Sequence, residues 1–246
     1  MPALLAAASS CYNHRQLNEA EHLCARILDK DPRHARALHL AGLVALSMGN
    51  LSEAQERLAR SAARQPGADV LVDLAAALMA NGNLQEAVRC CRKALEGAPN
   101  HAGAHYNLGT ALNRLHEFGA AIPSLQEAVR LAPEYLPARA NLGQALRGAG
   151  EPDAARIELE RVLELDPSHS NALFNLANVR HELGDYSRSD ELFAQALAAV
   201  PGNPQIRYDY ALALLSRGEF ARGWELFEAR WDAHHVADRV QYPQPE

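Results

Sequence analysis

The chain is 246 residues long and carries a formal net charge of −6. This acidic balance argues against a binder of duplex nucleic acid or of an anionic membrane, because both need a basic surface. Hydrophobic residues make up 48% of the chain but aromatic residues only 6%, since alanine supplies roughly a fifth of it. Alanine is the best helix former and lets helices approach closely, so the composition favours a helical protein.

The first segment, MPALLAAASSC, is apolar, but it lacks the basic residues with which a secretory signal begins, and its apolar run is short for such a signal. No run of about 18 apolar residues follows anywhere in the chain, so the sequence predicts no membrane insertion. The cysteines are Cys11, Cys24, Cys90 and Cys91, which form neither a disulfide framework nor a CxxC pair. We therefore expect a cytoplasmic protein.

Proline recurs along the chain with a period of about 34 residues. The intervals are 34, 33, 34, 34 and 34 residues, between Pro32, Pro66, Pro99, Pro133, Pro167 and Pro201. Small residues share the frame: glycine lies 24 residues before three prolines (Gly42, Gly109, Gly143), and alanine lies 12 residues before five (Ala20, Ala54, Ala87, Ala121, Ala155). A period carried by several independent positions indicates an array of repeated structural units.

Each period has the pattern of two amphipathic helices, as residues 102–135 show best. Helical spacing predicts that one face of a first helix carries His105, Leu108, Gly109 and Leu112. The facing side of a second helix carries Ala121, Leu125 and Ala128. Proline then ends the second helix. Because neither helix can bury its apolar stripe alone, the units must stack into a solenoid.

These residues resemble the tetratricopeptide repeat family, whose Leu-Gly, alanine and proline pattern is met best in residues 102–135. The resemblance implies an all-α, right-handed superhelical solenoid of about seven helix-turn-helix units over residues 1–231. The units begin near residues 1, 35, 68, 102, 136, 170 and 204, and residues 232–246 are expected to form a linker or tail. The first unit departs most, with Ala7 and Ala8 in place of Leu-Gly, and the seventh has Gly223 where alanine is usual.

The resemblance also implies that the first helix of each unit lines a concave groove that binds a peptide. We call the corresponding side of these first helices, opposite their core stripe, the groove face. Its candidate residues are Tyr106, Asn107, Thr110, Asn113, Arg114, Asn141, Gln144, Arg147, Asn171, Phe174, Asn175, Asn178 and His181.

Three of these candidates, Asn107, Asn141 and Asn175, recur at 34-residue intervals, with Asp73 and Asp209 in register on either side. An amide both donates and accepts hydrogen bonds, so a row of amides can hold the backbone of an extended peptide whatever its sequence. A similar asparagine ladder lines the groove of O-linked N-acetylglucosamine transferases. The alternative interpretation is that these asparagines bond a neighbouring helix and maintain the superhelix.

Other sites are not predicted. The early groove positions include Asp69 and Asp73, whereas the co-chaperone type of groove uses lysine and arginine to clamp a terminal carboxylate. His34, His101 and His169 recur at a turn position without companion ligands, so no metal site is expected. No catalytic motif, phosphate-binding glycine loop or cofactor motif is present, and we expect no enzymatic activity from this chain.

The last predicted helix carries an aromatic stripe, with Phe220, Trp224, Phe227 and Trp231 spaced at i, i+4, i+7 and i+11. A solenoid normally ends in a polar cap, so we expect this stripe to form a terminal interface, such as a homodimer contact. The segment around Arg230–Trp231 and Tyr242–Pro245 resembles the junction of bacterial proteins in which these repeats precede a glycosyltransferase domain.

Three functions follow as hypotheses. The chain binds a protein or peptide segment in its groove as an interaction scaffold. Alternatively, it is the substrate-recognition region of a bacterial glycosyltransferase whose catalytic domain is not in this chain, or a scaffold that assembles with its own copies.

Overall fold

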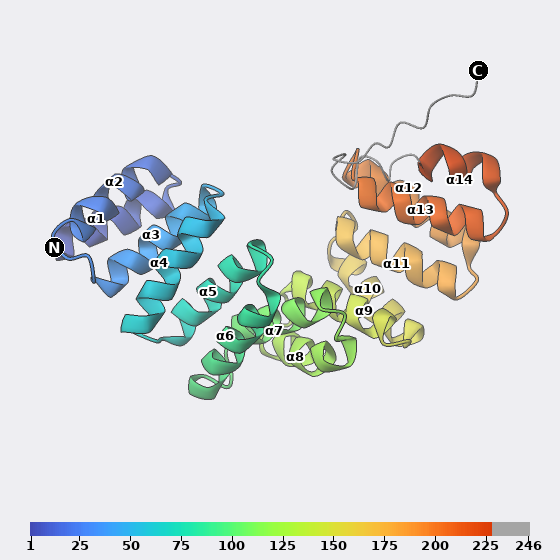
Figure 1. The fold of residues 1–246 in the computed structure, drawn as a ribbon. Helices are drawn as coiled ribbons and strands as arrows, with labels where there is room; N and C mark the ends of the chain where they lie inside the picture. Colours follow the sequence, from blue (N-terminus) through green and yellow to red (C-terminus); the bar gives the residue numbers. More distant parts are fainter. Residues whose placement is uncertain (228–246) are drawn as a thin grey trace, which may run out of the picture. The chain divides into compact units, whose positions relative to one another are not determined.

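The computed structural model describes residues 1–227, and this part of the chain forms fourteen α-helices and no strand (Figure 1). The helices are α1 (Pro2–Asn13), α2 (Leu17–Leu28), α3 (Ala35–Ser47), α4 (Leu51–Arg64), α5 (Ala68–Ala80), α6 (Leu84–Gly97), α7 (Ala102–Arg114), α8 (Phe118–Leu131), α9 (Leu136–Gly148), α10 (Pro152–Leu165), α11 (Ser170–Glu182), α12 (Tyr186–Ala199), α13 (Pro204–Ser216) and α14 (Phe220–Phe227). The predicted all-α repeat fold is confirmed. The expected tail, residues 232–246, lies outside the described residues.

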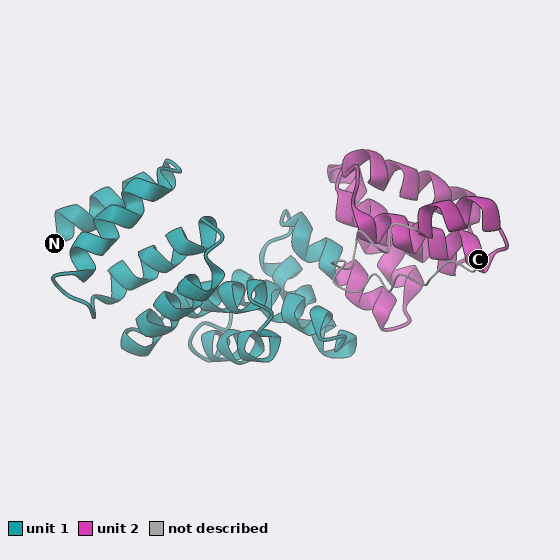
Figure 2. Cartoon of the chain, turned by 45° about the horizontal axis from the view of Figure 1, so that its top comes forward, with its two compact units in different colours: residues 1–141 teal, residues 142–246 magenta. Residues whose placement is uncertain are grey.

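Helices that follow one another pack as hairpins, for example α7 with α8 and α11 with α12. Two compact units contain these hairpins, residues 1–141 and residues 142–246 (Figure 2). In the first unit, one core cluster is formed by Ala8, Leu23, Cys24, Leu40 and Ala41. In the second unit, Leu192, Phe193 and Leu214 are almost completely buried. None of the described helices is long and apolar enough to cross a membrane.

Glycine lets the two helices of a hairpin come into close contact. A Cβ atom added to Gly109 on α7 would lie 2.4 Å from Cγ of Leu125 on α8, well inside van der Waals contact. Leu125 is fully buried at this crossing. The Leu-Gly pattern of the sequence therefore reflects a steric requirement of the helix pair.

The turn inside each hairpin contains one residue in the left-handed region. Gly82 has a φ of +82°, and the same conformation recurs at Gly49, Gly150, Gly184 and Gly218. In the fourth hairpin His116 takes this conformation with a φ of +60°, and in the first hairpin Arg15 does so with a φ of +61°. A side chain is strained in this region, so these two turns depart from the more favourable glycine.

Histidine caps the start of three odd-numbered helices. The Nδ1 atoms of His34, His101 and His169 each accept a hydrogen bond from the backbone N–H three residues later, at 3.2, 3.1 and 3.2 Å. Each bond satisfies one of the backbone donors that a helix leaves free at its N-terminus. The periodic histidines thus have a structural role.

Candidate functional site

In the first unit, two side chains of the groove face tie α7 to α5. Asn107 is buried, and its Nδ2 donates to the carbonyl oxygen of Val72 at 3.1 Å. Arg114 is exposed, and its guanidinium donates to the carbonyl oxygen of Met79 at 2.7 Å. Both bonds cross from one repeat to the one before it.

The next candidates form a connected network. Thr110 donates to the carbonyl oxygen of Tyr106 at 2.8 Å and accepts a hydrogen bond from Nδ2 of Asn141 at 2.9 Å. Nδ2 of the buried Asn113 donates to the carbonyl oxygen of Asn141, also at 2.9 Å, while its Oδ1 is buried without a partner. Tyr106 packs edge-on against Tyr135, with ring centroids 5.0 Å apart.

Two further polar pairs join neighbouring repeats of the first unit, and the sequence did not predict them as pairs. His39 and Asp73 lie 2.6 Å apart, Nε2 to Oδ2, and both are partly buried. Nε2 of His101 lies 3.0 Å from Oδ1 of Asp69. Asp73 occupies the same position in its repeat as Asn107, Asn141 and Asn175. The repeat pattern therefore indicated the side of the helix on which Asp73 lies, but not that His39 is its partner.

In the second unit, the asparagines of α11 bond within their own helix. Nδ2 of Asn175 donates to the carbonyl oxygen of Asn171 at 2.8 Å, and Nδ2 of Asn178 to that of Phe174 at 3.0 Å. Asn171 is exposed and Asn175 is 7% exposed. The ring of Phe174 contacts the buried Phe193, with centroids 6.4 Å apart.

Other candidates of this unit join neighbouring repeats. Arg147 on α9 pairs with Glu182 on α11 at 3.2 Å. Nε2 of His181 lies 3.1 Å from the hydroxyl oxygen of Ser216 on α13. Gln144 on α9 is half-buried. Arg147 and His181 thus link odd-numbered helices, as Asn107 and Arg114 do in the first unit.

Between α11 and α13 the second unit contains a pocket of about 350 Å³, lined by Asn178, His181, Asp209, Leu212, Ala213 and Ser216. Asp209 accepts a hydrogen bond from Nε2 of Gln205 at 2.8 Å. Burial raises the pKa of Asp209 despite this bond and a weaker opposing influence of Arg147. Burial, followed by the charge of Arg217, lowers the pKa of His181 and favours its neutral form.

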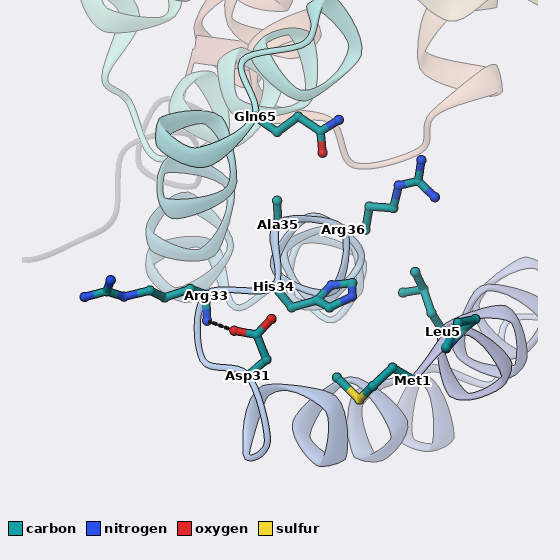
Figure 3. A pocket seen from close by; sticks show the side chains of 9 residues that line it. Met1, Leu5, Asp31, Arg33, His34, Ala35, Arg36 and Gln65 are labelled. Carbon is teal, nitrogen blue, oxygen red and sulfur yellow. Dashed lines mark hydrogen bonds between the residues drawn. The ribbon is translucent and has the colours of Figure 1, made fainter.

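A second pocket, of about 450 Å³, lies in the first unit where α1 meets the turn before α3 (Figure 3). Its lining includes Leu5, Asp31, Arg33, His34 and Arg36. Oδ1 of Asp31 accepts the backbone N–H of Arg33 at 3.0 Å, and Nδ1 of His34 is used in the cap of α3. The Arg33 and Arg36 side chains extend in different directions, so the two charges do not converge.

Of the predicted terminal stripe, three aromatic residues are described. Phe220 and Trp224 are 61% and 54% exposed. Phe227 stacks on Tyr208 of α13 at a centroid distance of 5.6 Å and contacts Trp224 edge-on at 5.2 Å. One part of the stripe therefore packs inward and another faces solvent. Trp231 lies outside the described residues.

Two buried cysteines, Cys24 and Cys91, are held in the unreactive thiol form. Burial raises the pKa of the Cys24 thiol to about 11 and that of the Cys91 thiol to about 12. Such thiols stay protonated at neutral pH, and the thiolate is the reactive form. Within residues 1–227 no three His, Cys, Asp or Glu side chains gather as a metal site.

Comparison with known families decides what kind of array this is. Three family models, each described as tetratricopeptide repeat, match residues 14–78, residues 68–134, and residues 140–204 with 182–231. The chain belongs to the tetratricopeptide repeat family. A search of curated proteins gave no match.

Solved tetratricopeptide structures have the same fold. A tetratricopeptide repeat protein from Parabacteroides merdae ATCC 43184 is 15% identical, with a TM-score of 0.76 over 96% of this chain and 94% of that one. YrrB, a tetratricopeptide protein with an unusual peptide-binding site, is 22% identical, with a TM-score of 0.60 over 79% and 97%. MamA from Desulfovibrio magneticus RS-1 is 24% identical, with a TM-score of 0.61 over 69% and 96%. At these identities the likeness concerns the fold.

Proposed function

We propose that the groove face of this tetratricopeptide protein binds an extended segment of a partner protein. The repeat fold and its structural neighbours support a protein-interaction scaffold. Binding in the groove is the finer proposal, and the observation that carries it is the state of the asparagine ladder.

Each ladder amide is fixed in place by a hydrogen bond from its own nitrogen. Asn107 bonds Val72, Asn141 bonds Thr110, and Asn175 bonds the backbone of its own helix. Within the described residues, none of the three Oδ1 atoms has a hydrogen-bond donor. A carbonyl oxygen held rigid before binding can accept a peptide N–H with little further loss of entropy. Asn107 and Asn141 in the first unit, and Asn175 in the second, therefore each offer an acceptor to an extended backbone.

The three asparagines differ in what else their hydrogen bonds hold together, and this difference decides which of them is suitable for a binding test. Removing Asn107 breaks a bond between repeats, so its alanine variant would mix stability with binding. Asn175→Ala removes a bond within one helix, whose carbonyl acceptor also serves the helix itself, and should therefore leave the melting temperature nearly unchanged. Asn113 gives the matched control, because its Oδ1 is buried while its Nδ2 ties α7 to α9.

The experiment selects decapeptides from a random library on the wild-type chain and measures the affinity of the best binder for each variant. We expect Asn175→Ala to weaken binding about fivefold to tenfold, the effect of one lost hydrogen bond. Asn113→Ala should lower the melting temperature but leave the affinity of the folded chain unchanged. Selection of no peptide, or equal affinities for wild type and Asn175→Ala, would refute binding by the ladder.

Self-assembly remains a second proposal because of the exposed aromatic residues Phe220 and Trp224. The glycosyltransferase proposal rests mainly on residues 230–245, which lie outside the described residues. Reading the gene beyond Glu246 and assaying sugar-donor turnover by the complete product would test it.

A further inference from the structure

The pocket between α11 and α13 contains a carboxylate, Asp209, that has no ion-pair partner among the described residues, although Arg147 attracts it weakly from a distance. Asp209 hydrogen bonds only to the neutral amide of Gln205. The nearby cations are already committed: Arg147 pairs with Glu182 at 3.2 Å, and Arg217 pairs with Asp190 at 2.6 Å. Within the part of the chain that the structure describes, no cationic group lies within ion-pairing distance of Asp209. A cation placed beside a partly buried carboxylate favours its ionised form.

The polar lining of the pocket offers acceptors and uses its donor groups internally. Nδ2 of Asn178 donates to the carbonyl oxygen of Phe174. The hydroxyl of Ser216 donates to the carbonyl oxygen of Ala213 at 2.8 Å, an arrangement in which it accepts from a protonated Nε2 of His181. What remains for a ligand is the second oxygen of Asp209 and Oδ1 of Asn178, together with Nδ1 of His181, which is buried without a partner and is an acceptor when Nε2 carries the proton. A ligand that fits this lining brings donors and positive charge.

The shape of the pocket favours a long cationic side chain. Its volume is about 350 Å³, and one wall is Leu212, which is 43% exposed although it is a large apolar residue. The methylene stem of lysine or arginine packs on apolar surface of this kind while its charged end reaches a polar group. Leu212 and Asp209 occupy the ninth and sixth positions of the last repeat, both on the groove face.

We infer that this pocket receives a lysine or arginine side chain of the segment bound along the groove face, with Asp209 as its counter-ion and Leu212 as the wall for its stem. The inference rests on the proposed function, which it deepens by adding a sequence preference to a ladder that reads only backbone. The other pocket, beside α1, gives no comparable case because its arginines do not converge.

The direct test uses small probes and therefore does not depend on peptide capture. Nα-acetyl-lysine N-methylamide and its norleucine counterpart, which has a similar stem without the charge, are titrated into the ¹⁵N-labelled chain. We expect saturable shifts of the backbone amides of residues 178, 181, 212 and 216 with the lysine probe, and affinity lower by about tenfold with norleucine. Equal affinities for the two probes would overturn the inference.

The variant that isolates the charge is Asp209→Asn, which keeps the shape and the acceptor for Gln205. Asp153→Asn is the matched control, since it removes the same charge from an exposed residue of α10. Asp209→Asn should lower the affinity for the lysine probe about tenfold and Asp153→Asn should not change it. An unchanged Asp209→Asn affinity, or equal losses in both variants, would refute a role for Asp209.

A library selection links the pocket to the groove. Decapeptides selected on wild type should carry lysine or arginine at one fixed position, and those selected on Asp209→Asn should lose this preference. Captured peptides without a basic position would overturn the inference and leave the proposed function standing. Saturable lysine binding with no captured peptide would overturn the proposed function and confine the result to cation recognition by the pocket.

Discussion

At the scale of single residues, side-chain shape is matched at one crossing in the hairpins. Where the second helix carries leucine the first carries glycine, as in the pairs Gly42 and Leu58, Gly109 and Leu125, and Gly143 and Leu159. In three other hairpins the corresponding residue of the second helix, sixteen positions after the crossing residue of the first, is cysteine or phenylalanine. The first helix then carries alanine, as in the pairs Ala8 and Cys24, Ala75 and Cys91, and Ala177 and Phe193. The branched Cγ of leucine occupies the place that a Cβ on the first helix would need.

This matching predicts a rescue. Gly109→Ala should destabilise the chain by about 1 to 3 kcal/mol, because the added methyl group meets Leu125 at the crossing. Adding Leu125→Cys, which reproduces the pair found at Ala75 and Cys91, should recover at least about 1 kcal/mol relative to the sum of the single losses. Urea unfolding of the four chains measures this coupling.

The matched control for that cycle is Gly119→Ala, on the second helix of the same hairpin. A Cβ on Gly119 would meet nothing within 4 Å, so alanine there should be neutral or slightly stabilising. A loss at Gly119 as large as that at Gly109 would mean that the crossing is not the cause.

A second prediction at this scale concerns the charge on Asp209. Burial raises its pKa in the folded state, so the ionised carboxylate opposes folding at neutral pH and its protonation in acid relieves this cost. Asp209→Asn should therefore be at least as stable as wild type at neutral pH, and this advantage should shrink as the pH falls through the raised pKa. Chemical unfolding at neutral and acidic pH tests the sign, and a destabilised variant at neutral pH would contradict it.

At the scale of elements, α14 differs from the other second helices in its aromatic residues. Among its described residues, Phe220 and Trp224 are exposed to solvent, whereas Phe227 packs on Tyr208. Pairs of large exposed aromatic residues are uncommon on monomer surfaces and often mark a contact. Association of two copies through α14 therefore stays a prediction.

The variant Trp224→Glu tests this contact. If two copies associate through α14, the wild-type chain should sediment as a concentration-dependent dimer, and a charge at position 224 should shift it to monomer. Exposed Ile157 on α10 provides the control, because Ile157→Glu changes an isolated apolar residue elsewhere. A wild type that is monomeric at every accessible concentration would contradict the homodimer.

At the scale of the whole molecule, stability should follow position along the array. Leu142 and Leu176 are 3% and 4% exposed inside the second unit, whereas Leu4 on α1 is only partly buried. Leu142→Ala and Leu176→Ala should each cost about 2 to 5 kcal/mol, and Leu4→Ala clearly less. Equal losses in urea unfolding would contradict a stack held together by contacts between neighbouring repeats.

Periodicity predicted the fold well because one helix pattern repeats at many positions, so errors at single residues average out. It also gave Asn107 and Asn175 the same position within their repeats. Periodicity could not predict that Asn107 donates to the preceding repeat while Asn175 donates within its own helix. Several carbonyl oxygens lie within reach of such an amide, and the repeat pattern does not determine which of them accepts the hydrogen bond. The lack of an ion-pair partner for Asp209 was equally hidden, because it depends on which partners the nearby arginines take.

The pairing of glycine with leucine has a consequence for how such a protein can lengthen or be recombined. A complete hairpin carries both members of its pair, so a duplication or exchange with boundaries in the proline turns transfers a sterically consistent module. A boundary in the glycine turn would instead join one repeat's first helix to another's second helix, and could place alanine opposite leucine. Repeats can thus be exchanged at the proline turns between hairpins without disturbing the helix crossing, but not at the glycine turns within hairpins.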